Sequence, residues 1–434
     1  WPLLYGGKLF GAGMAVTVAI QHLLGLAIAV VMYRICLGLG VARPVAAVIT
    51  MPVLLDGYEL QIEQNLMAEV WSDAFLLAAV WLLLAWRLRR GGDQPTQRLA
   101  GSGPLWWQAG IAGLLIGADV PIRVIGAAAV VPFVAYLVRA GARRRDRDWW
   151  RTMLIRTAAG LAGFGIVLGG YLGAASGDTA PGGLSDGGAL LYGRAANVAN
   201  CDQLPLDKYV AQVCPKQPVG RRLGVDTYAW HPMVAHYLPP DGTQARLKIE
   251  FTTLVLKHQP LDMAGAMVHD FLKGFAWTKV WSPGDMPPSR WQFQTAYPRW
   301  PATDADPWTL YFDHTVPHVV KPLATFLRGY QLSIGYTPGT LLGVAGVVAI
   351  AGVLRRRDGT AGLRAESLLA VGIALTLVGG AAIFEFSWRY QLPGLVFFPL
   401  AGAIGFAHQQ RTVRDWFSVR RRGISVAQAL RRRS

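Results

Sequence analysis

Long apolar runs, separated by short connections rich in arginine, constrain this sequence more than any other feature. Of its 434 residues, 53% are hydrophobic and 16% are charged. A helix that crosses a bilayer needs such a run, because its backbone polar groups must be bonded within the segment. The sequence therefore predicts a mainly α-helical, polytopic membrane protein with about nine spans. The expected spans are 12–33, 42–55, 66–86, 104–118, 121–138, 154–174, 338–354, 365–385 and 391–408.

The positions of the basic residues predict the orientation of these spans. The net charge is +16, and most of the 42 Lys and Arg residues lie in alternate connections or in the tail after Arg411. Those segments should face the cytoplasm by the positive-inside rule. Lys8, Arg123 and Arg389 are the exceptions on the opposite side. Because the position of the charge explains its excess, no nucleic-acid partner is expected, and we expect the cytoplasmic (inner) membrane as the location.

The apolar runs and the charge pattern divide the chain into four parts. The block between the sixth and seventh spans is rich in Asp, Pro, Gly, Trp and His, and parity places it outside the cytoplasm. We expect it to be helical, with helices near 245–258 and 261–275. The parts are an N-terminal transmembrane core with an acidic outer loop (1–174), a large extracytoplasmic α-rich domain (175–336), C-terminal spans (337–410) and a basic cytoplasmic tail (411–434).

Two of the three cysteines, Cys201 and Cys214, lie in the expected extracytoplasmic domain. In an oxidising compartment they should form a disulfide, which stabilises the fold by roughly 3 kcal/mol on a loop-entropy estimate. Cys36 falls near the cytoplasmic face, and no role is assigned to it.

A cluster of carboxylates follows the second apolar run. Its members are Asp56, Glu59, Glu63, Glu69 and Asp73. On helices, the first three would share one face and the last two would pair at i, i+4. Asp73 should lie on the order of 10 Å deep in its span, where an unpaired carboxylate costs roughly 2.5–3.5 kcal/mol and must face the protein interior. The cluster is either a solvated connector with a structural pair, or the floor of an active site.

A second cluster lies between the last two spans, where Glu385, Arg389 and Tyr390 are surrounded by aromatic residues. It could be an aromatic belt with a snorkelling arginine. It could also hold a lipid phosphate, because arginine binds phosphate in a bidentate manner. The position of Arg389 on a side otherwise poor in cations favours the phosphate interpretation. Asp119 and Arg123, at the outer end of a helical hairpin, are expected at the same level.

The remaining motifs exclude several functions. His314 and His318 are spaced i, i+4 beside Asp313, but the sequence has no HExxH-type metal motif. It also has no phosphate-binding P-loop and no GxGxxG. A pump driven by cytosolic nucleotide is therefore not expected.

Taken together, the short spans, the acidic outer loop, the LMAE that opens the third span and the late WRYQLP resemble the GT-C class of polytopic glycosyltransferases. The resemblance is to the bacterial, phospholipid-carrier-dependent enzymes related to protein mannosyltransferases. WPLLYGGKLF resembles the end of that family's first outer loop, and LLYGRAANVANCDQ is similar to part of its external domain. The family's principal catalytic Asp lies in the first outer loop, so the resemblance implies that this chain starts after it and is inactive by itself.

The resemblance implies transfer of a sugar from a polyprenyl-phosphate donor to a cell-envelope glycan, lipid or protein. By position, Glu69 would be the family's second functional acid and Arg389 its lipid-phosphate ligand. Asp73 and Asp56 are the other candidate catalytic acids, and a divalent cation could assist. The candidate substrate-binding residues are Glu59, Glu63, Asp119, Arg123, Glu385, Arg389 and Tyr390.

We further expect Glu69 and Arg389 to line one outward-facing cavity. The alternative is a non-catalytic membrane protein, such as a lipid-linked-sugar transporter or a scaffold. A transporter should show pseudo-symmetric halves, and the sequence contains no such repeat.

Overall fold

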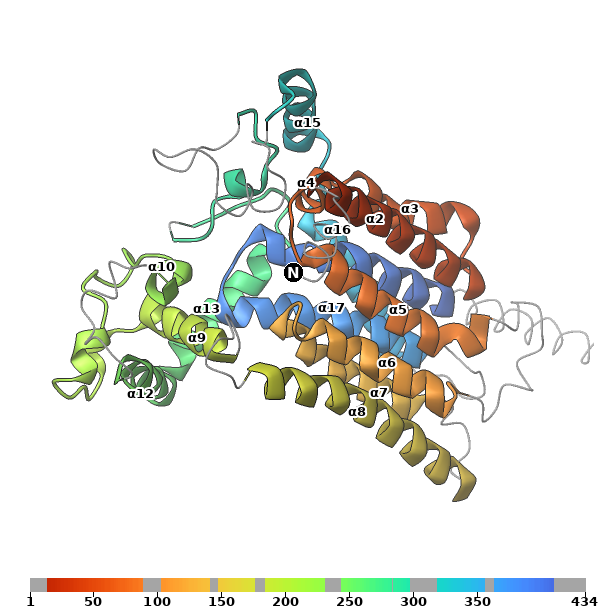
Figure 1. Ribbon diagram of the computed structural model, residues 1–434, viewed down its shortest axis with the longest axis horizontal. Helices are drawn as coiled ribbons and strands as arrows, with labels where there is room; N and C mark the ends of the chain where they lie inside the picture. Colours follow the sequence, from red (N-terminus) through yellow and green to blue (C-terminus); the bar gives the residue numbers. More distant parts are fainter. Residues whose placement is uncertain are drawn as a thin grey trace, which may run out of the picture.

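The computed structural model describes residues 14–88, 103–140, 147–175, 184–230, 243–282, 284–296, 318–355 and 363–409. Within these ranges the regular structure is helical and no strand is present. The long helices lie side by side in a bundle, and α9, α10 and α12 gather beyond one end of it (Figure 1). The prediction of a mainly α-helical chain is therefore confirmed. The expected tail at 411–434 and His314 lie outside the described ranges, whereas His318 is described and exposed.

In the described residues, a helix lies in each of the nine ranges expected to span a membrane. Five of these helices are long and apolar enough to cross one, or six if the bent pair α3 and α4 counts as one span. The helices are α2 (Met14–Gly38), α3 (Arg43–Leu55), α5 (Glu69–Leu88), α6 (Trp106–Asp119), η2 with α7 (Val124–Arg139), α8 (Arg147–Ala175), α16 (Gly339–Leu354), α17 (Arg364–Phe384) and Trp388–Gln409.

The second expected span is broken, in agreement with its short apolar run. The helix α3 meets α4 (Gly57–Gln64) at an angle of 50°. Asp56 stands at the break, where it ends α3 and caps α4. The acidic residues after Asp56 thereby leave the direction of α3 and turn toward α2 and α5, which α4 contacts.

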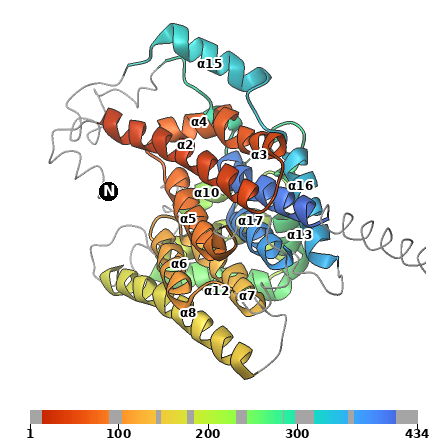
Figure 2. The same cartoon turned by 90° about the vertical axis from the view of Figure 1, so that its right-hand side faces the viewer.

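Viewed along the bundle, α2, α3 and α4 form one group, and α6, α7 and α8 form another (Figure 2). The helix α5 connects the two groups, since it contacts α2 and α6. The helix α17 packs against α7, α16 and α5. Between α6 and α8 the backbones approach closely, since a Cβ atom at Gly113 would lie 2.0 Å from the carbonyl oxygen of Gly160. Small residues commonly allow this contact between membrane helices.

The helix ends that adjoin the Arg-rich connections meet at one end of the bundle. Gly38 packs against Leu88, and Arg156 lies beside Gly103. The backbone N–H of Leu363 donates to His408 over 3.2 Å. The opposite end, which we call the acidic end, carries Glu69, Asp119 and Arg389. The helix ends beside the Arg-rich connections and those of the acidic end thus lie at opposite ends of the bundle, as the charge pattern predicts.

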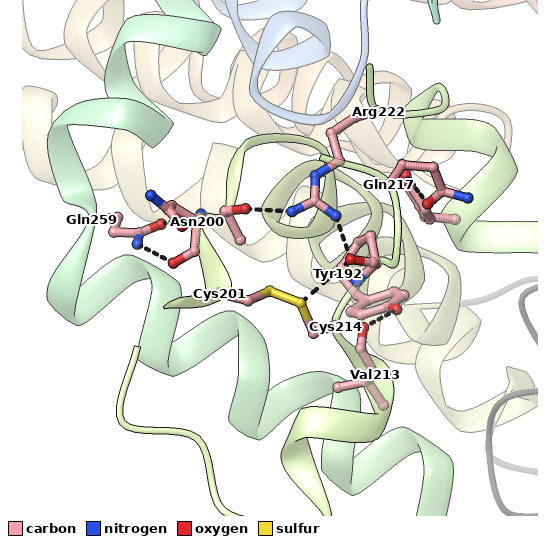
Figure 3. Close-up of a disulfide and its surroundings, with 11 residues drawn as sticks. Tyr192, Asn200, Cys201, Val213, Cys214, Gln217, Arg222 and Gln259 are labelled. Atoms are coloured by element: carbon pink, nitrogen blue, oxygen red, sulfur yellow. Dashed lines mark hydrogen bonds between the residues drawn. A yellow bond between two sulfur atoms is a disulfide. The ribbon is translucent and has the colours of Figure 1, made fainter. Parts of the chain in front are cut away.

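A second hydrophobic core lies beyond the acidic end. It is built by α9 (Leu184–Val198), η4 (Val210–Val213), α10 (Val225–Trp230), α12 (Thr243–His258) and α13 (Pro260–Lys273), around buried side chains such as Tyr192 and Phe251. Cys201 and Cys214 form the predicted disulfide (Figure 3). The two helices expected near 245–258 and 261–275 are confirmed as α12 and α13.

A buried ionic network joins this helical unit to the bundle. Arg194 on α9 pairs with Asp270 on α13 and donates to the carbonyl oxygens of Phe384 and Ala382, at 3.0 and 3.2 Å, at the end of α17. Lys273 lies between Asp270 at 2.8 Å and Asp285 at 2.7 Å. Because the Arg194 side chain is only 3% exposed, these partners are what make the burial of its charge tolerable.

Replacement of Asp270 by alanine should leave two buried cations without their shared partner. Removal of one member of a buried ion pair typically costs about 3–5 kcal/mol, so we expect a clear fall in the midpoint of thermal unfolding of the detergent-solubilised protein. Asp262→Ala, on an exposed position of the same helix, is the matched control and should change the midpoint little. Equal midpoints for the two variants would contradict the role of the network.

Candidate functional site

Glu69 and Arg389 meet at the acidic end of the bundle. Glu69 is the first residue of α5, and Arg389 belongs to the short helix η6 (Trp388–Gln391) that follows α17. The Nε atom of Arg389 lies 2.9 Å from Oε1 of Glu69. The expected meeting of these two distant residues is confirmed, whereas an outward-facing cavity lined by both stays a prediction. The Glu69 side chain is 2% exposed and that of Arg389 is 23% exposed, so a ligand can reach the guanidinium without opening the bundle.

Aromatic rings hold the guanidinium of Arg389 in place. Its Cζ atom lies 4.9 Å from the ring centroids of both Trp291 and Tyr390. Arg123 approaches the same tyrosine ring at 5.8 Å. Tyr390 therefore stands near two guanidinium groups that come from different parts of the chain. Two such groups around one ring suit recognition of a dianionic group such as a phosphate.

Arg123 also connects this pair to two deeper carboxylates. Asp73 on α5 and Asp119 at the end of α6 are both fully buried, and the charge of Arg123 acts on both. Ser72 lies beside Asp119, and Gly126 leaves room for its carboxylate. Neither oxygen of Asp73 has a hydrogen-bond partner among the described residues. Burial of a carboxylate without a hydrogen-bond partner costs free energy. Carboxylates of this kind are typical of functional sites and are not needed for packing.

The carboxylates on α4 divide into different environments. Glu59 is 1% exposed and lies within electrostatic range of Asp73 and Glu69, and its Oε2 atom has no partner among the described residues. Glu63 instead turns toward α2, where its Oε2 atom lies 2.7 Å from Nδ1 of His22. Glu59 and Glu63, which we expected on one face of a helix, therefore have different neighbours. Glu59 lies near Glu69 and Asp73, whereas Glu63 pairs with His22.

The contacts of Asp56 favour a structural role over the expected catalytic one. One carboxylate oxygen accepts from the backbone N–H groups of Tyr58 at 2.9 Å and Glu59 at 3.4 Å. The other accepts from the N–H of Thr337 at 2.6 Å. Asp56 is thus the N-cap of α4 and ties it to the segment before α16, so we do not retain it among the proposed catalytic groups.

Glu385, expected beside Arg389 and Tyr390, lines a separate cavity of about 630 Å³. Burial raises the pKa of Glu385 to about 8, the charge and hydrogen bond of Asp226 act in the same direction, and Arg389 and Arg194 oppose them. Glu385 therefore remains within range of Arg389 but faces Asp226 on α10. The cavity is bounded by loop residues 220–224 and 284–287.

Sequence reasoning missed His22, Trp291 and Lys279, all of which contact the acidic end. His22 pairs with Glu63, Trp291 packs on Arg389, and Lys279 lies against the aromatic rings of Tyr58 and Trp388. None of them stands in a motif. The only available signal was the density of aromatic residues between 277 and 291.

The carboxylates do not assemble into a metal centre. In the part of the chain that the structure describes, no group of three or more His, Cys, Asp or Glu side chains is placed to hold one ion. The donor set therefore does not fit the divalent cation that the sequence left open, and we derive no step through a metal.

Comparison with known proteins adds no assignment to this geometry. No family model matches the chain, and no curated protein and no solved structure is significantly similar to it. The function must therefore be argued from the residues themselves.

The raised pKa of Glu385 predicts a specific dependence of stability on pH. The ordinary value for glutamate is 4.5 and the folded value is about 8, so the folded chain binds more protons than the unfolded chain between these values. The free energy of unfolding must then fall as the pH rises through this window, by at most about 1.4 kcal/mol per pH unit from this group. Glu385→Gln should flatten the dependence.

The measurement is the midpoint of thermal unfolding in detergent from pH 5 to pH 8.5. Glu250→Gln, at an exposed position on α12, should retain the slope of the unmodified protein. If Glu385→Gln also retained that slope, the buried protonated carboxyl would be ruled out.

Proposed function

We propose that this chain is the membrane-embedded part of a GT-C-type glycosyltransferase that uses a polyprenyl-phosphate sugar donor at the outer face of the cytoplasmic membrane. The observation that carries the proposal is the ion pair between Glu69 and Arg389. In this pair the carboxylate of Glu69 is buried and the guanidinium of Arg389 is partly exposed. The resemblance to carrier-dependent glycosyltransferases gives these two residues an acid role and a phosphate role.

In this proposal the donor phosphate binds Arg389, with Tyr390 and Arg123 beside it. A phosphate that takes the guanidinium of Arg389 displaces the carboxylate of Glu69, because both compete for the same N–H donors. Binding of the donor would thereby free Glu69 at the moment when a base is needed. The partly exposed guanidinium and the two nearby aromatic rings support such an exchange.

The transfer step needs no nucleotide. The hydroxyl oxygen of the acceptor attacks the anomeric carbon of the sugar, and the bond from that carbon to the phosphate oxygen breaks with its electron pair on the phosphate. Glu69 accepts the hydroxyl proton as a general base, a role that typically contributes about 10²–10⁴ in rate. Arg389 and Arg123 stabilise the charge of the departing polyprenyl phosphate. Asp73 and Glu59, which lie near Glu69, are placed to receive the proton afterwards.

An ion-coupled transporter of lipid-linked sugars is the second candidate. The observation that favours it is the buried pair Asp73 and Asp119, since ionisable residues at membrane depth often carry protons or ions in transporters. The two candidates differ in their products. A transferase forms a new glycosidic bond, whereas a transporter moves the intact lipid-linked sugar.

The test measures sugar transfer from a polyprenyl-phosphate donor by the protein in proteoliposomes. Arg389→Ala should raise the KM for the donor by about 10- to 100-fold, because it removes charge-assisted hydrogen bonds to the phosphate. Glu69→Gln should mainly lower kcat, by about 10²-fold or more.

The matched controls are Arg364→Ala, at the opposite end of the bundle, and Glu250→Gln, on the exposed face of α12. Both should keep transfer activity. Full activity of the Glu69 and Arg389 variants would remove these residues from the mechanism, and donor translocation without any transferred product would favour the transporter.

A further inference from the structure

A second cavity is lined in part by η5 (Pro288–Trp291), the short helix whose Trp291 packs on Arg389. Its volume is about 440 Å³, which is enough for a small saccharide. Among its lining residues are three aromatic side chains, Tyr58, Trp281 and Tyr336, and the polar side chains of Thr278, Ser289, Gln292 and Gln331. Ligand sites commonly combine such apolar walls with a few polar groups that fix orientation.

Lys279 supplies the positive charge of this cavity. Its ammonium nitrogen lies 4.5 Å from the ring centroid of Tyr58, 4.4 Å from that of Trp388 and 6.0 Å from that of Tyr336. Such distances correspond to cation–π contacts. No carboxylate of the described residues lies within 4.0 Å of this nitrogen, and both oxygens of the nearby Asp56 are used by backbone N–H groups. The cavity therefore contains a cation with aromatic neighbours, and among the described residues the charge of Asp56 acts on it without a direct ion pair.

The amides of the wall are positioned by the protein itself. Gln331 is fully buried, accepts from the N–H of Phe293 at 2.9 Å and donates to the carbonyl oxygens of Gly57 at 2.9 Å and Trp291 at 3.1 Å. Gln292 donates to the hydroxyl of Tyr58 at 3.2 Å. These bonds fix Tyr58 and η5, so the aromatic wall is formed before any ligand enters.

The cavity shares its wall with the site at Arg389. Trp388, which packs against Lys279, directly precedes Arg389, and its indole N–H donates to the carbonyl oxygen of Val280 at 2.8 Å. Trp291, which packs on Arg389, directly precedes Gln292 of the cavity. Its indole N–H donates to the hydroxyl of Ser387 at 3.1 Å. A molecule in the cavity would therefore lie next to a donor whose phosphate is bound at Arg389.

We propose that this cavity binds the acceptor, and that the acceptor is a saccharide carrying a negative charge, either a carboxylate or a phosphate. This inference rests on the proposed glycosyl transfer for its acceptor role. The aromatic rings of Tyr58, Trp281 and Tyr336 suit the C–H faces of a sugar, and the exposed hydroxyls of Thr278 and Ser289 suit its hydroxyl groups. The ammonium of Lys279 suits the anion, because a charge-assisted bond to an anionic group would add the direct contact that no carboxylate of the described residues makes.

The cavity can be tested without any donor, by calorimetric titration of the detergent-solubilised protein with small probes. Glucuronate and glucose 6-phosphate represent the two forms of anionic sugar. Glucose and inorganic phosphate represent the sugar and the anion alone. Both anionic sugars should bind at least about tenfold more tightly than either glucose or phosphate, since each single probe lacks one set of contacts.

Lys279→Met should weaken binding of the anionic sugars by about 10- to 100-fold and leave glucose unaffected, whereas Lys279→Arg should stay within about threefold of the unmodified protein. Trp281→Ala provides a second variant, because this side chain is 54% exposed and its removal leaves the core intact. It should weaken binding of both anionic sugars by about 3- to 10-fold through loss of stacking.

Equal binding of glucose and glucuronate, or binding of glucuronate that is insensitive to both Lys279→Met and Trp281→Ala, would overturn the proposal. Inorganic phosphate that binds as tightly as glucose 6-phosphate would also overturn it, since the site would then read only the anion. The failure of the proposed function is distinguishable. If the proposed transfer is wrong, the anionic sugars would still bind with the expected dependence on Lys279, but no sugar transfer would occur. That result would remove the acceptor role and leave the binding site.

Discussion

The ion pair between Glu69 and Arg389 is the contact on which the arrangement of the acidic end depends. Burial of the Glu69 carboxylate, which is 2% exposed, costs free energy unless a partner offsets the loss of water. That partner comes from the turn that leads into the last span. The pair therefore ties the first half of the chain to the last, and the segments that carry Trp291, Tyr390 and Arg123 pack around it.

The charges around this pair do not balance. Glu59, Glu69, Asp73 and Asp119 are buried near one another, and within the described ranges Arg123 and Arg389 are the cations that face them. Several of these oxygens have no hydrogen-bond partner in the described residues. Packing alone does not select such an arrangement, because an apolar replacement of the same volume is often as stable. The imbalance supports a role in moving protons or in holding a charged substrate.

The sequence predicted the level of each group along the bundle better than the direction in which it points. Apolar runs and arginine positions placed Glu69, Asp119, Arg123 and Arg389 at one end, because span length and charge parity determine depth. The disulfide between Cys201 and Cys214 followed from the compartment that the same parity implies. The expected meeting of Glu69 and Arg389 is confirmed for this reason.

Rotation about each helix axis and the paths of the loops could not be predicted in the same way. Glu63 turns to His22 because α3 and α4 meet at an angle of 50° at Asp56. A break of this kind has no unique signature in the sequence. Lys279 was missed because its aromatic neighbours come from three distant segments, at Tyr58, Tyr336 and Trp388. A short apolar stretch predicts a helix more securely than it predicts a membrane crossing. Among the described residues, five of the nine expected spans, or six with the bent pair, are long and apolar enough to cross a membrane.

The most direct measurement of the central claim is a double-mutant cycle between Glu69 and Arg389. The free energy of unfolding would be measured in detergent for Glu69→Gln, Arg389→Gln, the double variant and the unmodified protein. Residues in direct contact typically show an interaction energy of about 0.5–3 kcal/mol. We predict a coupling of at least about 1 kcal/mol, because one partner is almost fully buried. Additive effects within about 0.3 kcal/mol would show that the two side chains do not interact, and would contradict the shared site.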